Sequence, residues 1–231
     1  MPEQTILITG AGGGLGTPVV AFFLDKGFRV IATVSAEAGK KDLPPHPALD
    51  VQAVDLSDEA AVAAFIDGLV VSYGTIDAAI LLVGGFAMGS LAETRGIDLA
   101  KMFTLNFETA YYVTHPLYAH MLKQGKGRIV FVGARPALVP SQGKNAVAYA
   151  LSKSLLFQLA EILNADAKGR DVVANVVVPS TIDTAANRKS MPDADFDTWV
   201  KPEQLAALFH FICSDTAAPL RDPVWKVYNK A

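Results

Sequence analysis

The sequence predicts an α/β fold, in which about seven parallel strands form one doubly wound sheet flanked by helices. Short runs rich in β-branched residues alternate with longer amphipathic segments, which is the pattern of strand–helix–strand units. Hydrophobic residues make up 51% of the chain and charged residues only 19%, and this composition favours strands that are buried on both faces. The length of 231 residues fits a single domain over 1–231.

The strands are expected at the β-branched runs, and the helices between them. The predicted strands are 5–9, 29–34, 51–55, 78–83, 128–133, 172–178 and 224–228. The predicted helices are 15–26, 58–72, 98–123, 145–168 and 202–214. Gly27, Gly74 and Gly169 follow three of these helices, where a left-handed residue commonly ends a helix. The segment 185–201 shows no regular pattern, and a long segment of this kind usually covers a site.

Composition excludes several classes of function. The formal net charge of −3 gives no basic surface for nucleic acid or an anionic membrane, so neither partner is expected. The longest apolar run, 78–83, is far shorter than the ~20 residues that span a bilayer. The single cysteine, Cys213, excludes an intrachain disulfide and favours a reducing, cytoplasmic compartment. The four histidines lack metal-ligand spacing, so no metal site is expected.

A glycine-rich stretch joins the first strand to the first helix. Its residues are Thr9, Gly10, Gly12, Gly13, Gly14, Leu15 and Gly16. Glycines there permit a tight turn, close approach of a pyrophosphate to the main chain, and close packing of helix on strand. The helix N-terminus adds free N–H groups and a positive dipole. This strand–turn–helix context predicts a Rossmann-type site for a nicotinamide dinucleotide, NAD or NADP.

The second strand leaves the choice between the two dinucleotides open. An acidic residue about 20 residues after the glycines commonly binds the adenosine ribose hydroxyls of NAD. Here the strand ends in Val34 and Ser35, and no acid follows until Glu37. Ser35, together with Lys40 and Lys41, can instead meet the 2′-phosphate of NADP. Solvated lysines are an equally good interpretation.

Tyr149 and Lys153 open the helix after the fifth strand. Residues four apart share one helical face, so the phenol and the ammonium group can converge on one point. A free tyrosine has a pKa of about 10, and a nearby lysine charge is expected to lower that pKa toward the working range. Reduction of a carbonyl-like group needs a hydride on one atom and a proton on its neighbour, and this pair can supply the proton.

The chain resembles the short-chain dehydrogenase/reductase family over nearly its whole length. Thr9, Gly10, Gly14 and Gly16 match its glycine motif, and Tyr149 with Lys153 matches its acid–base pair. The resemblance implies that Asn106 belongs to the catalytic proton relay. It also implies cofactor contacts from Asp55, Leu56, Val83, Gly84, Gly85, Pro179, Ser180, Ile182 and Thr184.

Two departures from that family stand out. The family's Asn-Asn-Ala-Gly after the fourth strand reads Leu81-Leu82-Val83-Gly84 here, followed by Gly85-Phe86. The family's catalytic serine falls where this chain has Ala134, which has no hydroxyl. Ser141 lies too far along the loop to replace it.

Dihydropteridine reductases, a group within that family, are similar to this chain at these same places. The shared stretches are VGGFAMG (83–89), VGARPAL (132–138) and IDTAANRKSMPDADFDTW (182–199). This resemblance implies hydride transfer from NADH or NADPH to a quinonoid dihydropteridine or a similar acceptor. Phe86 and Trp199 would offer ring faces to a flat heterocycle, although core or lid packing also accounts for both. Ala134, Arg135 and Met191 complete the expected substrate residues.

Two other functions remain open. One is a general short-chain reductase of small ketones or quinones, and Ala134 counts against an ordinary ketone. The other is a protein that senses NAD(P) without turnover, and the intact pair Tyr149 and Lys153 counts against it.

Two features of the whole chain are also expected. The segment 185–201 would close over the substrate as a flap. The predicted helices 98–123 and 145–168 would join a homodimer or homotetramer. They carry more apolar side chains than one face on the sheet requires, namely Met102, Phe103, Phe107, Tyr111, Leu155, Leu156, Phe157 and Leu159.

Overall fold

A computed structural model describes residues 4–221 and 223–230 of the chain. Its centre is one seven-stranded sheet in the order β3-β2-β1-β4-β5-β6-β7, and every neighbouring pair is parallel. The strands are β1 (Thr5–Thr9), β2 (Arg29–Val34), β3 (Leu49–Ala53), β4 (Ala78–Leu81), β5 (Lys126–Val132), β6 (Asp171–Pro179) and β7 (Val224–Val227). The strand order reverses between β1 and β4, so their carboxyl ends border the crevice in which such sheets bind ligands.

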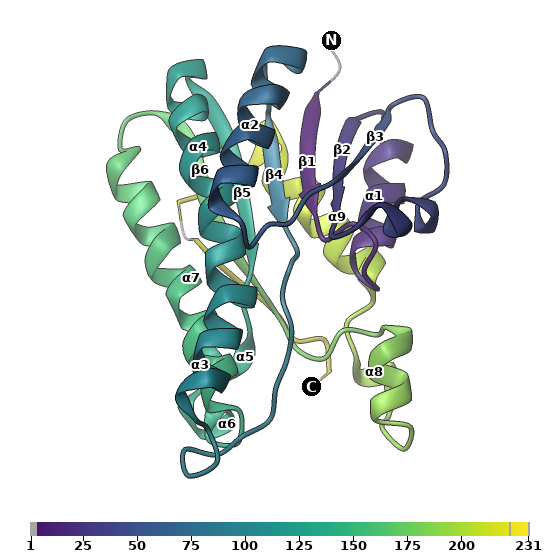
Figure 1. Cartoon of the computed structure of the whole chain (residues 1–231), viewed down its shortest axis with the longest axis vertical. Helices are drawn as coiled ribbons and strands as arrows, with labels where there is room; N and C mark the ends of the chain where they lie inside the picture. The colour runs from purple at the N-terminus through teal and green to yellow at the C-terminus, as the bar shows by residue number, and fades with distance from the viewer. Residues whose placement is uncertain (1–3, 222, 231) are drawn as a thin grey trace.

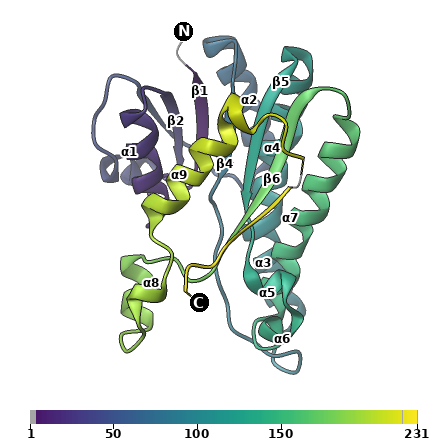
Figure 2. The ribbon, with the colours of Figure 1, turned by 180° about the vertical axis from the view of Figure 1, so that it is seen from behind.

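Helices cover both faces of the sheet. On the face seen in Figure 1 lie α2 (Glu59–Tyr73), α4 (Thr109–Gln124) and α7 (Val147–Asp166). On the face seen in Figure 2 lie α1 (Gly16–Asp25) and α9 (Pro202–Cys213). Alternate residues of β1 point to opposite layers, because Leu7 packs under the first group and Ile6 and Ile8 under the second. The predicted doubly wound α/β fold is confirmed.

Shorter helices follow the carboxyl ends of the strands. They are α3 (Gly96–Phe103), α5 (Arg135–Leu138), α6 (Pro140–Gly143) and α8 (Ala185–Ser190), with 3₁₀ turns η1 (Glu37–Asp42) and η3 (Phe196–Thr198). A further 3₁₀ turn, η4 (Asp215–Ala217), follows α9. None of the helices within the described residues combines the length and the apolar character that crossing a bilayer requires.

Most predicted elements differ from those observed by one or two residues at an end, and three differences are described here. The third strand was expected at 51–55 but is Leu49–Ala53, because its pairing stops where β2 stops, at Val34 opposite Ala53. The helix expected at 98–123 is interrupted by a wide π-turn, η2 (Thr104–Glu108), between α3 and α4. The segment 185–201 was expected to be irregular, but it holds α8, whose first turn is capped by the Thr184 hydroxyl, and the turn η3.

Candidate active site

The glycine-rich loop between β1 and α1 forms a cradle of main-chain donors. Gly10 has φ +66°, which only glycine adopts without strain. A Cβ at Gly16 would clash with the Gly10 carbonyl, so helix and loop approach too closely for any side chain. Among the described residues, no backbone hydrogen bond uses the N–H groups of Gly14, Leu15 or Gly16. These free donors at a helix N-terminus fit the phosphates of a dinucleotide.

A cleft of about 830 Å³ opens beside this loop at the carboxyl ends of the strands. Five segments line it: Gly10, Gly12 and Gly13; Thr33, Val34, Ser35, Gly39 and Asp42; Val54, Asp55, Leu56 and Ser57; Leu82, Val83 and Gly84; and Lys101, Thr104, Leu105 and Thr109. The cleft thus brings together eight of the predicted cofactor residues from four different strand ends. Asp55 follows β3 as expected, and hydrogen bonds from the Ser57 hydroxyl and N–H lower the pKa of its carboxyl group.

The other predicted cofactor residues lie beyond the lining of this cleft. Thr9 is buried, and its hydroxyl accepts a hydrogen bond from the Leu82 N–H at 3.1 Å, so it fixes the end of β4. Gly14 lies against Thr184, because a Cβ there would come within 3.0 Å of the Thr184 Cβ. Pro179 ends β6, and the Ser180 hydroxyl after it donates to the Tyr228 carbonyl at 2.9 Å. Ile182 pairs with Val200 in a single bridge.

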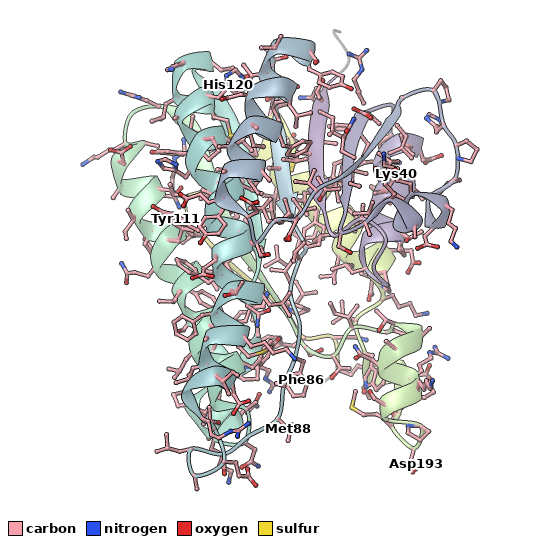
Figure 3. The ribbon with its side chains drawn as sticks, in the orientation of Figure 1. Lys40, Phe86, Met88, Tyr111, His120 and Asp193 are labelled. Carbon is pink, nitrogen blue, oxygen red and sulfur yellow. The ribbon has the colours of Figure 1, made fainter. Side chains whose placement is uncertain are left out.

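Lys40 and Lys41 do not line the cleft. The Lys40 ammonium instead pairs with Glu37 of the same turn at 3.0 Å, and its side chain is labelled in Figure 3. The interpretation of these lysines as solvated therefore describes the structure better than contact with a 2′-phosphate. Ser35 lies in the cleft as expected, beside Gly39 and Asp42.

Asn106 is completely buried in the π-turn and holds the segment after β4. Its Oδ1 accepts from the Gly85 N–H at 2.9 Å, and its Nδ2 donates to the Gly85 carbonyl at 3.1 Å. Nδ2 also lies 3.1 Å from the Ser152 hydroxyl, which donates to the Tyr149 carbonyl. Ser152 thus joins the loop to the helix that carries Tyr149. Sequence reasoning missed it, although helical spacing three residues after Tyr149 was an available signal.

Lys153 lies beside Gly84, where a side chain would collide with the ammonium group. Its Nζ donates to the Val132 carbonyl at 2.8 Å, and burial lowers the pKa of Lys153 to about 8. Burial also raises the pKa of Tyr149 to about 12. The expected lowering of the Tyr149 pKa by Lys153 is therefore not present here, because desolvation dominates and the ammonium group turns toward β5. Catalytic hydrogen bonds are often loose in a free enzyme and tighten when ligands bind.

The five predicted substrate residues occupy different environments. Phe86 is 61% exposed and lies edge-on to the Tyr149 ring, with centroids 5.0 Å apart. Figure 3 shows it on the segment after β4, across from α8. Ala134 is buried between β5 and α5, and the guanidinium of the next residue, Arg135, lies 4.7 Å over the Tyr228 ring. This contact from the far end of the chain carried no signal in the sequence.

The remaining two substrate residues lie on the segment after β6. Met191 is 40% exposed after α8, whereas Trp199 is only 5% exposed. The Trp199 ring packs at 4.8 Å on Phe196, and its carbonyl accepts from Asn229 at 2.8 Å. Trp199 therefore differs from expectation, because packing leaves no open ring face for a substrate.

Comparison with known proteins identifies the family. The family model described as short chain dehydrogenase matches residues 4–195. The chain belongs to this family. As a short chain dehydrogenase it is an NAD(P)-dependent oxidoreductase. The coarse function predicted from sequence is confirmed.

Relatives of this short chain dehydrogenase act on varied substrates. Dihydropteridine reductase of Dictyostelium discoideum is 27% identical, over 99% of this chain and 96% of that protein. D-threitol dehydrogenase of Mycolicibacterium smegmatis is 26% identical, over 93% of this chain and 87% of that protein. The solved structure of ElxO with NADP bound is 21% identical, covers 97% of each chain and has a TM-score of 0.90, which shows the shared fold.

Proposed function

We propose that this enzyme reduces a quinonoid dihydropteridine, or a flat acceptor like it, with NADH or NADPH. The observation that carries the proposal is the exposed Phe86 ring beside Tyr149. Aromatic rings favour stacked or edge-on contacts with other rings. A flat heterocycle resting on Phe86 would therefore lie next to the phenol that delivers a proton.

In the proposed reaction, the protein side chains supply and stabilise the transferred proton. A bound reduced nicotinamide supplies a hydride, and a proton from Tyr149 completes the addition of two electrons and two protons to the acceptor. A pKa of about 12 keeps the Tyr149 phenol protonated at neutral pH, as a proton donor requires. Lys153 follows Tyr149 by one helical turn on α7, and in this proposal its ammonium group turns from the Val132 carbonyl to stabilise the phenolate left behind. Asn106 and Ser152 hold the two segments that meet at this point.

Ala134 favours an acceptor that is already activated. A buried methyl group stands where a hydroxyl would orient an unactivated ketone, and no hydrogen bond from this side chain can polarise a carbonyl. A quinonoid ring needs less help, because reduction restores a more stable ring system. The Dictyostelium reductase, which spans nearly the same length, supports this choice of acceptor.

General reduction of small ketones or quinones is the second candidate. The relatives with other substrates favour it, D-threitol dehydrogenase among them. Binding of NAD(P) without turnover is the third, and the presence of both Tyr149 and Lys153 on α7 counts against it.

A turnover screen tests these candidates directly. NADH and NADPH would each be incubated with quinonoid dihydropterin, with a set of quinones and with simple ketones, and cofactor oxidation followed by absorbance. We expect the highest kcat/KM with the dihydropterin and the lowest with ketones. Faster reduction of ketones would favour the general reductase, and no oxidation with any acceptor would favour the sensor.

A further inference from the structure

The turn η1 (Glu37–Asp42) folds back beside the glycine-rich loop. A Cβ built on Gly12 would lie 3.9 Å from the Gly39 carbonyl oxygen and 4.0 Å from Oδ2 of Asp42. The Ala11 N–H donates to the Thr33 carbonyl at 3.0 Å, which ties the same loop to the end of β2. The Asp42 carboxylate therefore stands where the glycine loop, β2 and η1 meet, on the wall of the cleft.

This meeting point is where a dinucleotide domain holds the adenosine ribose. A carboxylate after the second strand accepts hydrogen bonds from the ribose hydroxyls of NAD, and it opposes the phosphate that NADP carries on the same ribose. The residue that follows β2 here is Ser35, which has no charge. Asp42, seven residues after Ser35, places a carboxylate in the wall of the same cleft.

Among the described residues, no cation near this wall forms an ion pair with Asp42. Lys40 is paired with Glu37, and Lys41 lies outside the cleft lining. Lys101 lines the cleft, but from α3 beside Thr104 and Leu105, next to the end of β4. Two strand spacings separate β2 from β4, or about 10 Å. Within the described part of the chain, no hydrogen bond or ion pair engages the Asp42 carboxylate.

We propose that Asp42 selects the cofactor, so that this enzyme uses NADH in preference to NADPH. The carboxylate accepts the ribose hydroxyls of NADH and repels the 2′-phosphate of NADPH. ElxO, which has the same fold, binds NADP, so the fold alone does not decide the preference. The inference rests on cofactor binding by the family and is independent of the pterin acceptor.

Equilibrium titration of both cofactors tests the proposal without any acceptor. Kd values for NADH and NADPH would be measured by fluorescence for the wild type, for Asp42→Asn and for Asp67→Asn. Asp67 is an exposed carboxylate on α2 outside the cleft, so its variant removes the same charge from the protein. Thermal unfolding of each variant confirms that the exposed substitutions leave the fold intact.

We expect the wild type to bind NADH at least about tenfold more tightly than NADPH, the difference that ~1.4 kcal/mol produces. Asp42→Asn should reduce this ratio about tenfold, mainly through tighter binding of NADPH, and Asp67→Asn should leave it unchanged. The wild-type ratio should also shrink as salt is raised, because salt screens charge repulsion.

Three results would overturn the proposal. They are wild-type binding of NADPH as tight as that of NADH, an unchanged ratio in Asp42→Asn, and an equal change in Asp67→Asn. Failure of the proposed function would look different, since loss of dihydropterin turnover leaves the cofactor ratio in place. Absence of binding by either cofactor would refute both.

Discussion

Phe86 and Tyr149 meet edge to face at 5.0 Å, and the Tyr149 hydroxyl is the proton donor in the proposed reaction. Tyr149→Phe removes that proton without changing the glycine cradle. We expect turnover to fall by ~10²–10⁴, and by the lower figure with an activated acceptor, while the Kd of the cofactor stays nearly constant. Steady-state kinetics and cofactor titration measure the two effects separately.

Tyr73→Phe provides the matched control. Its hydroxyl donates to Asp50 at 2.8 Å beside β3, outside the cleft, so this variant loses one phenolic hydroxyl and should keep its activity. Wild-type turnover of every acceptor by Tyr149→Phe would show that Tyr149 is not the acid.

Because Lys153 is buried, we expect the free energy of unfolding to depend on pH. Burial lowers its pKa from the usual 10.5 to about 8, a difference worth roughly 3 kcal/mol. Below pH 8 both folded and unfolded chains carry the proton, so the folded state bears the full cost of a buried charge. Between pH 8 and 10.5 the unfolded chain binds more protons than the folded one, and stability rises with pH. The wild type should gain roughly 3 kcal/mol over Lys153→Met across this interval.

Urea denaturation at pH 7, 8.5 and 10.5 measures that gain. Lys123→Met, at an exposed position on α4, should differ from the wild type by the same amount at every pH. A constant difference for Lys153→Met as well would contradict the assignment of a buried, destabilised charge. Lys153→Met should also lose turnover, because it removes the cation that is proposed to stabilise the Tyr149 phenolate.

At the scale of elements, side-chain contacts hold both ends of the segment after β6, at Asp183–Arg188 and at Phe196–Trp199. Arg188 forms two hydrogen bonds to Asp183, at 2.6 and 2.8 Å, and its guanidinium lies 4.5 Å over the Phe196 ring. These contacts engage the Arg188 side chain within its own segment. Phe196 continues the chain of contacts to Trp199. Residues 191–194 lie between these two sets of contacts, and Figure 3 labels Asp193 on the loop that follows α8.

We expect this segment to act as a flap over the cofactor and the acceptor. Hydrogen exchange should be fastest at 191–194 in the free enzyme, and slower across 185–199 when NADH or NADPH binds. A pterin analogue should slow it further. Equal exchange with and without ligands would contradict the flap, and a response to the cofactor alone would argue against a pterin acceptor.

The sequence predicts elements well where the signal is local. The glycine loop follows from backbone geometry at a few adjacent residues, and the buried strands follow from runs of β-branched residues. The π-turn was not predictable, because Thr104–Glu108 contains no helix-breaking residue. The turn holds Asn106, whose side chain hydrogen-bonds the backbone of Gly85 about twenty residues earlier, and no local pattern reports this contact. The Trp199 carbonyl likewise accepts a hydrogen bond from Asn229, thirty residues away, which no local pattern predicts.

At the scale of the whole molecule, α4 and α7 expose apolar side chains on their outer faces. Of the residues expected to be in excess, Met102, Leu156 and Leu159 are used by the core. Tyr111 is 38% exposed, and two positions not singled out from sequence, Leu151 and Ile162, are 48% and 55% exposed. We propose that a second copy of the chain covers this face in a homodimer, or in a homotetramer that contains it.

Ile162→Glu should convert the assembly to monomers, because it places a charge in an apolar contact. Sedimentation at micromolar concentration measures the mass. Val71→Glu is the control, since Val71 is an exposed apolar residue on α2 rather than on α4 or α7, and it should leave the mass unchanged. A monomeric wild type would contradict the dimer outright.

The π-turn η2 also determines how the side-chain faces of α3 are rotated relative to those of α4. A residue advances an α-helix by about 100°, and a π-turn accommodates one residue more than an α-turn does. Because of this extra residue, α3 faces α7 while α4 faces α2 and β5. Removing one residue from Thr104–Glu108 would restore an even helix and turn one of the two contact faces away from its partner. The segment therefore tolerates changes of side chain better than a change of length, and a single-residue deletion there is expected to be as damaging as the loss of a whole helix contact.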